Sequence, residues 1–192
     1  MDREIALLKE QIRKKILERR KSLSPKEVEE ASLKVVERIK ELPSFKRAKT
    51  VMLYYPVRGE IDLRPLFEEV LKDPQKVLLL PKVTRDGEML AVEVKPGVPL
   101  IKGVFGIPEP AGGRIVKAEK IDFVAVPGVA FDRRGCRLGM GKGFYDRFLP
   151  RVKGVKVGVA YDFQLIESVP CEEHDIPLDL IVTPSGIIER GG

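Results

Sequence analysis

The chain has 192 residues and contains no tryptophan, no asparagine, three glutamines, two cysteines and one histidine. The scarcity of amide side chains beside 35 basic and 29 acidic residues is typical of proteins from thermophiles, which avoid thermolabile amides and gain from ion pairs. The two cysteines, Cys136 and Cys171, lie far apart in the sequence and do not indicate a disulfide framework. We therefore expect the protein to occupy a reducing cytoplasm.

Long hydrophobic runs are also missing, because no stretch approaches the roughly 18 to 20 apolar residues that a membrane helix needs. The N-terminus is charged from Asp2 onward and has no apolar segment, which argues against a secretory signal. Asp2, Glu4 and Glu10 also argue against an acid-poor transit peptide. The net charge of +6 is mild and fits an anionic substrate better than a nucleic acid. We expect neither a membrane nor a nucleic-acid partner.

Two helices are predicted at the start of the chain. Apolar residues recur at three- and four-residue steps over residues 3–21, the pattern of an amphipathic helix. Ser24 and Glu27 form a capping-box pattern, with proline between them at the first helical position. The second helix therefore begins after Ser24, and we expect it to stop before Pro43.

The rest of the chain alternates strands with short helices. A short helix is expected after Asp62 as its cap, a hairpin at Asp86-Gly87, and a last helix near residues 143–149. Strands are predicted over residues 50–55, 76–83, 89–94, 123–126, 155–161 and 180–183. This alternation predicts a single α/β domain over residues 1–192, with a largely parallel sheet flanked by helices in a three-layer, Rossmann-like arrangement. Ligands of such sheets bind beyond the carboxyl ends of the strands, where the loops after residues 55, 126 and 161 lie.

The segment from Asp122 to Asp146 carries the strongest functional signal. Glycines stand at positions 135, 139, 141 and 143, with Arg137 and Lys142 between them and Asp146 at the end. Glycines let backbone N–H groups approach an anion, the cations neutralise its charge, and the carboxylate can hold a metal. We interpret this segment as a nucleotide triphosphate site.

The glycine spacing matches neither the P-loop nor the Rossmann fingerprint. A flexible surface loop is the alternative, since glycine and arginine are ordinary there. Apolar and aromatic residues recur through the segment, however, which argues against disorder.

Several motifs together match one family over nearly the whole chain. They are Lys9-x-x-Ile12-Arg13 followed by residues 20–24; Tyr54-Tyr55-Pro56 with Glu60-Ile61-Asp62; residues 127–132; the run Gly135 to Asp146; and His174-Asp175 with Asp179. In these motifs the chain resembles the 5-formyltetrahydrofolate cyclo-ligase family, also called 5,10-methenyltetrahydrofolate synthetases. Departures are small: Phe144 stands where tyrosine is common, and Met140 occupies a variable position.

The resemblance implies an ATP- and Mg²⁺-dependent ligase that forms a C–N bond, converting 5-formyltetrahydrofolate to 5,10-methenyltetrahydrofolate with release of ADP and phosphate. The formamide oxygen is a poor leaving group, so transfer of the γ-phosphoryl group to it would allow N10 to attack the carbon. Such an enzyme must clamp a triphosphate and place a pterin in line with it.

Arg137 and Lys142 are the catalytic candidates, because they could neutralise charge on the transferred phosphate. A surface ion pair is the alternative for Arg137. The resemblance also places ATP beside Lys9 and Arg13, although this helix is basic all round and both could be solvated. The full set of expected ATP-binding residues is Lys9, Arg13, Arg137, Leu138, Gly139, Met140, Gly141, Lys142, Gly143, Phe144 and Tyr145.

Glu60 is the expected reader of the pterin, because a carboxylate can accept two parallel hydrogen bonds from its amino group and ring N–H. Tyr55, Met140 and Phe144 would supply apolar walls, although Tyr55 could belong to the core.

Asp146 and Asp175 are the expected Mg²⁺ ligands, and Asp179 could replace Asp175. His174 is expected to have a structural or minor role. Cys136 is expected to be incidental, since no base is paired with it in the sequence.

Two other function classes compete with this interpretation. An α/β enzyme acting on sugar phosphates or CoA thioesters would share the strand pattern but would not need the constellation from Arg137 to Asp146. A nucleic-acid-binding protein could use the basic N-terminal helix and would show steep salt dependence. The chain carries no recognisable nucleic-acid motif. We expect a monomer.

Overall fold

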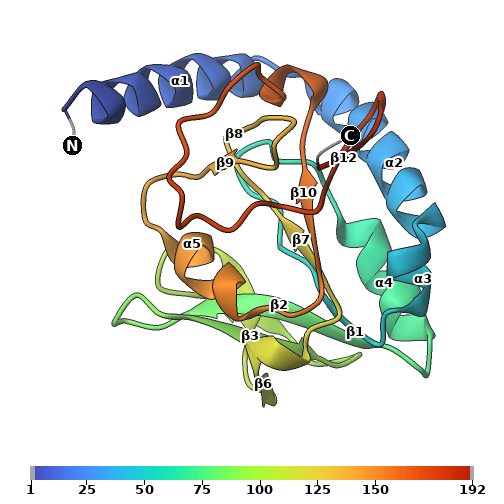
Figure 1. The fold of residues 1–192 in the computed structure, drawn as a ribbon. Coiled ribbons are helices and arrows are strands. Elements are labelled where there is room, and N and C mark those ends of the chain that lie inside the picture. Colours follow the sequence, from blue (N-terminus) through green and yellow to red (C-terminus); the bar gives the residue numbers. More distant parts are fainter. Residues whose placement is uncertain (1–2, 191–192) are drawn as a thin grey trace.

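The computed structural model describes residues 3–190 (Figure 1). The α-helices are α1 (Arg3–Lys21), α2 (Pro25–Glu41), α3 (Pro43–Arg47), α4 (Arg64–Lys72) and α5 (Phe144–Phe148). The 3₁₀ helices are η1 (Ala118–Lys120), η2 (Leu149–Arg151) and η3 (Asp162–Gln164). The strands are β1 (Thr50–Met52), β2 (Val77–Val83), β3 (Met89–Val94), β4 (Leu100–Lys102), β5 (Pro108–Pro110), β6 (Ile115–Val116), β7 (Phe123–Val126), β8 (Ala130–Phe131), β9 (Arg137–Leu138), β10 (Val155–Val159), β11 (Leu180–Thr183) and β12 (Gly186–Glu189).

Eight strands form the main sheet in the order β12-β11-β10-β7-β1-β2-β3-β6. The five strands from β11 to β2 run parallel to one another, and the sheet ends in antiparallel strands on both sides. The pairs β4–β5 and β8–β9 form separate two-stranded sheets. The expectation of an α/β fold with a largely parallel sheet is confirmed.

The parallel strands are wound in two directions from the centre of the sheet. From β1 the chain passes through α4 to β2 on one side, whereas from β7 it proceeds to β10 and β11 on the other. The neighbours β1 and β7 therefore flank the point at which the strand order reverses. In open α/β sheets, the crevice beyond the carboxyl ends of such strands is where ligands bind.

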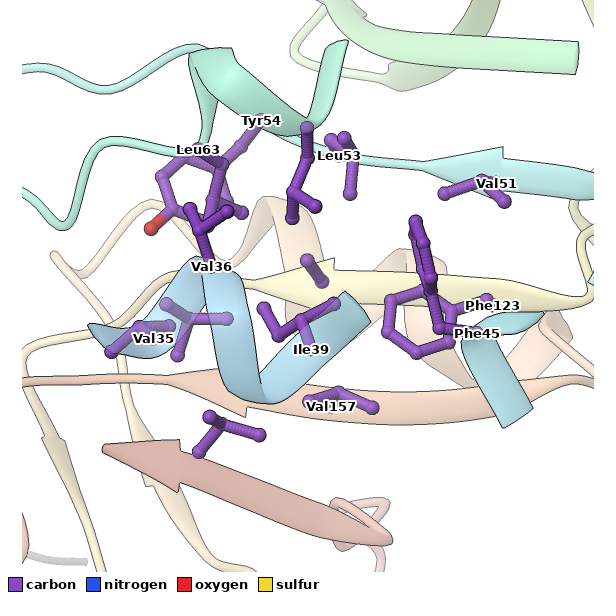
Figure 2. Close-up of a cluster of buried hydrophobic side chains, with 14 of the residues drawn as sticks. Val35, Val36, Ile39, Phe45, Val51, Leu53, Tyr54, Leu63, Phe123 and Val157 are labelled. Carbon is purple, nitrogen blue, oxygen red and sulfur yellow. The ribbon is translucent and has the colours of Figure 1, made fainter. Parts of the chain in front are cut away.

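The sheet buries one set of side chains on each face, because successive residues of a strand point to opposite sides. Val51 and Phe123 pack with Ile39 on the face covered by α2, α3 and α4 (Figure 2), and the Phe45 and Phe123 rings meet edge-on at 5.4 Å. Met52 and other residues of the opposite set pack with α5, η1 and η2. These helices on the two faces give three layers.

Helix α2 begins as predicted. Ser24 Oγ accepts the N–H of Glu27 at 3.1 Å, and Glu27 Oε1 accepts the N–H of Ser24 at 2.9 Å. Helix α4 differs from prediction, because Leu63 rather than Asp62 occupies its cap position. Asp62 instead accepts the N–H of Arg64 at 2.9 Å and pairs with the guanidinium group of Arg64.

Two other elements differ from the sequence prediction, β1 in its extent and α1 in its burial. Strand β1 ends at Met52, three residues early, because the chain then leaves the sheet and Tyr54 Oη donates to the carbonyl of Ile61 at 2.8 Å. Helix α1 has the expected bounds, yet Ile5 and Leu8 are exposed, and it buries only its C-terminal part.

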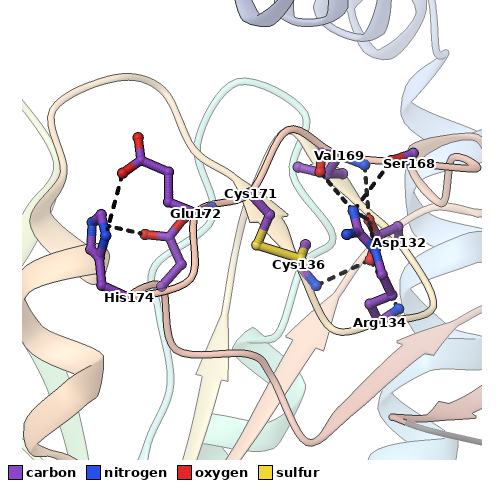
Figure 3. The surroundings of a disulfide bond; sticks show 9 residues. Asp132, Arg134, Cys136, Ser168, Val169, Cys171, Glu172 and His174 are labelled. Carbon is purple, nitrogen blue, oxygen red and sulfur yellow. Dashed lines mark hydrogen bonds and ion pairs between the residues drawn. A yellow bond between two sulfur atoms is a disulfide. The ribbon is translucent and has the colours of Figure 1, made fainter. Parts of the chain in front are cut away.

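The cysteine interpretation was wrong, because Cys136 and Cys171 form a disulfide (Figure 3). Their Cα atoms lie 6.0 Å apart although the residues are separated by 35 positions in the sequence. The bond joins the β8–β9 hairpin to the loop between η3 and β11. The two cysteines therefore no longer support the expectation that the protein occupies a reducing compartment. Within residues 3–190 no helix combines the length and the hydrophobicity needed to cross a bilayer.

Candidate active site

A cavity of about 340 Å³ lies beyond the carboxyl ends of β1 and β7. The loops that follow these two strands form part of its wall, as the winding of the sheet predicts. The expected site residues that line it are Tyr55, Glu60, Arg137, Gly139, Met140, Lys142, Gly143, Phe144, Tyr145 and Asp146. Five expected residues do not line it, namely Lys9, Arg13, Leu138, Gly141 and Asp175.

The glycine-rich segment folds as a hairpin. Ala130 pairs with Leu138 and Phe131 with Arg137. The fully buried Asp132 fastens the hairpin to the neighbouring loop, because its carboxylate accepts the N–H of Val169 at 2.8 Å (Figure 3). Beyond the hairpin, positive φ angles at Gly141 and Gly143 turn the chain into α5, a conformation that side chains with a Cβ disfavour.

Arg137 projects from β9 into the cavity with only 11% of its side chain exposed. Its Nε donates to the carbonyl of Pro127 at 2.6 Å, and its guanidinium carbon lies 5.0 Å from the centre of the Tyr145 ring. Burial lowers the pKa of Arg137, while the nearby Asp146, Tyr145 and Glu60 act in the opposite direction. A guanidinium group stays charged through such shifts, so this is a fixed cation with restricted orientation.

Glu60 stands in the turn after β1 on the same cavity. Its Oε1 accepts the N–H of Val57 at 2.9 Å. Burial raises the pKa of Glu60 above the usual glutamate value, although this hydrogen bond and the charges of Arg20, Arg137 and Arg58 oppose the rise. A carboxylate has several acceptor positions, so Glu60 can accept further hydrogen bonds from a ligand.

The sequence analysis missed Arg20, which is 4% exposed and lines the cavity from α1. Its Nε donates to the carbonyl of Arg58 at 3.1 Å. On the other side of the same turn, Tyr161 Oη donates to the carbonyl of Gly59 at 2.6 Å. Arg58 has a positive φ of 49°, an uncommon conformation for a residue other than glycine. Ile16 and Arg20 are four residues apart and share a face of α1, and this spacing is the one signal in the sequence that could have indicated burial of Arg20.

Phe105 is a second cavity residue that the sequence did not single out. It lies in the turn between β4 and β5, with its ring 5.5 Å from that of Phe144. The ammonium group of Lys142 lies 5.6 Å from the centre of the Phe105 ring. Phe105, Lys142 and Phe144 therefore meet across the mouth of the cavity.

Arg13 contacts the glycine-rich segment rather than the cavity. Its Nε donates to the carbonyl of Gly139 at 2.8 Å, and its guanidinium group also pairs with Glu10. Lys9 lies one turn earlier on α1 and is half-exposed. The buried Leu138 packs near the disulfide with Ala130 and Val169.

The carboxylates expected to bind a metal lie in different surroundings. Asp146 lines the cavity, and its side chain is 58% exposed. Asp175 lies in the loop before β11, where it accepts the N–H of Glu172 at 2.8 Å and its Oδ1 lies 3.7 Å from Nε2 of His174. Asp179 accepts the N–H of Lys156 at 2.9 Å. Residues 3–190 contain no group of three or more His, Cys, Asp or Glu side chains placed to hold a metal.

Comparisons with known proteins identify the family of the chain. The family model described as the 5-formyltetrahydrofolate cyclo-ligase family matches residues 6–184. The chain is 36% identical over 180 residues to a 5-formyltetrahydrofolate cyclo-ligase of Escherichia coli K12, covering 91% of this chain and 99% of that protein.

Two solved structures are also similar. One is an NMR structure of a 5,10-methenyltetrahydrofolate synthetase from Aquifex aeolicus, with a TM-score of 0.87 and 50% identity over 96% of this chain and 94% of that one. The other is a synthetase from Mycoplasma pneumoniae, with a TM-score of 0.75 and 30% identity over 92% of this chain and 98% of that one. The match in sequence, length and fold is full-length, and the chain therefore belongs to the 5-formyltetrahydrofolate cyclo-ligase family.

Proposed function

We propose that the cavity beyond the carboxyl ends of β1 and β7 is where this chain carries out the ATP-dependent reaction of its family. The reaction is the cyclisation of 5-formyltetrahydrofolate to 5,10-methenyltetrahydrofolate. The observation that carries the proposal is that Glu60 and Arg137 line one cavity from loops on opposite sides of the winding reversal. One is a carboxylate suited to a pterin, and the other is a buried cation suited to phosphate. The cavity thus brings the two substrates of the reaction together.

The reaction joins two steps. The formyl oxygen attacks the γ-phosphorus of ATP, and the bond to the β,γ-bridging oxygen breaks to leave ADP. The resulting imidate phosphate has phosphate as a good leaving group. N10 then forms a bond to the formyl carbon, the C–O bond breaks, and N10 loses its proton to give the methenyl bridge.

Arg137 and Lys142 act on the phosphate side. Charge on the transferred group is stabilised most by cations whose position is fixed before the reaction begins. The hydrogen bond to Pro127 and the contact with Tyr145 fix Arg137 in this way. Lys142 lies beside two glycines, where a phosphate can approach the backbone closely.

Glu60 acts on the pterin side, where it accepts hydrogen bonds from the amino group and the adjacent ring N–H. Tyr55, Phe144 and the exposed Met140 supply the apolar wall. Because Arg20 and Tyr161 hold the turn that carries Glu60, the carboxylate is oriented before folate binds.

A magnesium ion fits this donor set as a partner of ATP. Mg²⁺ uses one or two carboxylates together with phosphate oxygens and waters, so Asp146 alone beside the phosphate position is sufficient. When bound, the ion neutralises phosphate charge. Asp175 stays in the proposal as a second ligand, which requires the loop before β11 to approach the cavity.

The test is the rise in near-ultraviolet absorbance of methenyltetrahydrofolate when the protein is mixed with 5-formyltetrahydrofolate, ATP and Mg²⁺. Omission of any one component should abolish the signal. No signal from folded protein that still binds ATP would exclude this substrate. A cytoplasmic location and a monomeric state stay predictions, and sedimentation would test the second.

A further inference from the structure

Glu109 is a buried carboxylate that the proposed reaction does not use. It lies in β5, is 7% exposed, and belongs to the cavity wall. Its Oε2 accepts the N–H of Val83, the last residue of β2, at 3.3 Å. None of the ion pairs found within residues 3–190 involves Glu109. A buried carboxylate without a cation is costly to desolvate, so its presence here calls for a role.

The carboxyl group of Glu109 packs against the Cα of Gly103, the residue that directly follows β4. A Cβ added at Gly103 would collide with the carboxyl carbon and both oxygens of Glu109. Gly103 does not have a positive φ, so a side chain at this position would be opposed by the contact with Glu109 and not by the backbone conformation, and either Glu109 or the turn would have to shift. The carboxylate and the glycine therefore fit together as a pair.

The Gly103 contact fixes the turn that carries Phe105. The N–H of Gly103 donates to the carbonyl of Ile107 at 3.0 Å, and the N–H of Gly106 donates to the carbonyl of Gly103 at 3.0 Å. Phe105 stands at the tip of this turn, in contact with Phe144 and Lys142. A shift at Gly103 would move the tip and open the wall of the cavity.

We propose that Glu109 is a positioning residue: by linking the end of β2 to Gly103, it holds the β4–β5 turn so that Phe105 closes the cavity against Lys142 and Phe144. This role of Glu109 rests on the proposed function only for the identity of the ligand. The contacts among Glu109, Gly103 and Phe105 do not depend on it. Glu109 acts on substrate affinity through Phe105.

The first experiment measures the geometry without a ligand. Because the chain has no tryptophan, Phe105→Trp introduces a single tryptophan at the tip of the turn, whose emission can be excited apart from that of the four tyrosines. In the Glu109→Ala background its emission should shift to longer wavelength, because the ring at position 105, which is already 46% exposed, should lose its contacts with Phe144 and Lys142 and become more hydrated. Glu109→Gln keeps an acceptor for Val83 and should restore the original emission. Equal emission in all three backgrounds would overturn the proposal, even if the enzyme is active.

The second experiment is a double-mutant cycle on catalysis. Gly103→Ala should raise KM for 5-formyltetrahydrofolate on the order of tenfold, the size expected for directly coupled residues, with kcat changed much less. In the Glu109→Ala background the same substitution should add little, because the carboxyl group that it meets is gone. Gly112→Ala is the matched control, since a Cβ there meets nothing within 4 Å. The same loss from Gly103→Ala in both backgrounds would overturn the proposal.

The cycle also separates this proposal from the proposed function. If the unsubstituted protein does not convert 5-formyltetrahydrofolate, the proposed function fails, and the ligand-free fluorescence still tests Glu109. If it converts the substrate and the two substitutions act independently, the proposed function stands and the role of Glu109 fails.

Discussion

Arg137 Nη1 lies 3.5 Å from Asp146 Oδ1, which joins a largely enclosed cation of the site to a carboxylate that is more than half exposed. The pair brings together the group that we propose for phosphate and the group that we propose for the metal ion. Because Asp146 faces solvent, the ion pair contributes little to stability. The ion pair instead holds both charged groups next to each other in the cavity wall.

Arg137→Ala should lower kcat/KM by about 10²–10³, because a pre-organised cation at the transferred phosphate is lost. Arg137→Lys should not restore activity, since an ammonium group cannot both donate to Pro127 and stack on Tyr145. Steady-state kinetics with both substrates varied would measure this. Arg133→Ala, an exposed arginine of the same segment, is the matched control. Full activity of Arg137→Lys would show that positive charge alone is sufficient.

Glu60→Gln should stabilise the ligand-free protein at neutral and alkaline pH. Burial raises the pKa of Glu60, so the folded state binds this proton more tightly than the unfolded state does. The resulting stability is fully present below the pKa of an unfolded glutamate and is lost as pH rises through the folded pKa. Glutamine has no proton to lose, so the two melting temperatures should lie closest in acid, move apart between the unfolded and the folded pKa of Glu60, and keep a constant difference above it. A constant difference at every pH would contradict this linkage.

The same substitution should weaken folate binding and spare ATP binding. Glutamine keeps the acceptor for Val57 but cannot offer a carboxylate to two parallel donors. In the unsubstituted protein, folate affinity should also fall on acidification at a higher pH than for an ordinary glutamate, because protonation removes the acceptor. Calorimetric titration with each ligand would measure both effects. Equal loss of both ligands would remove Glu60 from the pterin position.

Asp146→Asn should raise the Mg²⁺ concentration needed for half-maximal activity, because one carboxylate ligand is lost. Asp175→Asn is the informative comparison, since Asp175 bonds within its own loop and lies outside the cavity wall. An Mg²⁺ titration at fixed ATP would separate the two carboxylates. A wild-type Mg²⁺ response in Asp146→Asn would exclude the ligand role of Asp146.

Loss of the disulfide should lower the free energy of unfolding by about 3–4 kcal/mol, the chain-entropy value for a loop of roughly 35 residues. The double substitution Cys136→Ser/Cys171→Ser and reduction by a thiol should give similar denaturant midpoints. Thiol titration of the unreduced, denatured protein provides the control. Two free thiols in that sample would contradict the disulfide.

Local sequence patterns predicted the elements that depend on neighbouring residues. The uninterrupted apolar runs gave the bounds of β7 and β11, and the Ser24–Glu27 capping box gave the start of α2. The run from Thr50 to Tyr55 is largely buried, but its last part lies outside β1, where Tyr54 Oη donates to the carbonyl of Ile61. Apolar composition indicates burial and does not distinguish these two outcomes.

Contacts between distant residues could not be predicted in this way. Arg20 meets Arg58 across 38 positions, and Glu109 meets Val83 across 26. In the sequence, both look like ordinary charged surface residues. Cys136 and Cys171 likewise became neighbours only through the fold. The glycine-rich segment was identifiable because its residues are contiguous, whereas the residues that orient its partners come from several elements.

Helix α1 contacts the two regions that we propose to bind the substrates. Arg13 bonds to Gly139 in the glycine-rich segment, and Arg20 bonds to the turn that carries Glu60, while Ile5 and Leu8 stay exposed. Ligands that stabilise these regions must also disfavour detachment of the helix, by thermodynamic linkage. The many lysines and arginines of α1 are cleavage points for trypsin, so ATP and folate should each slow tryptic cleavage of the first 21 residues. The resistance of α1 to trypsin therefore measures how much of the protein has ATP or folate bound in the cavity.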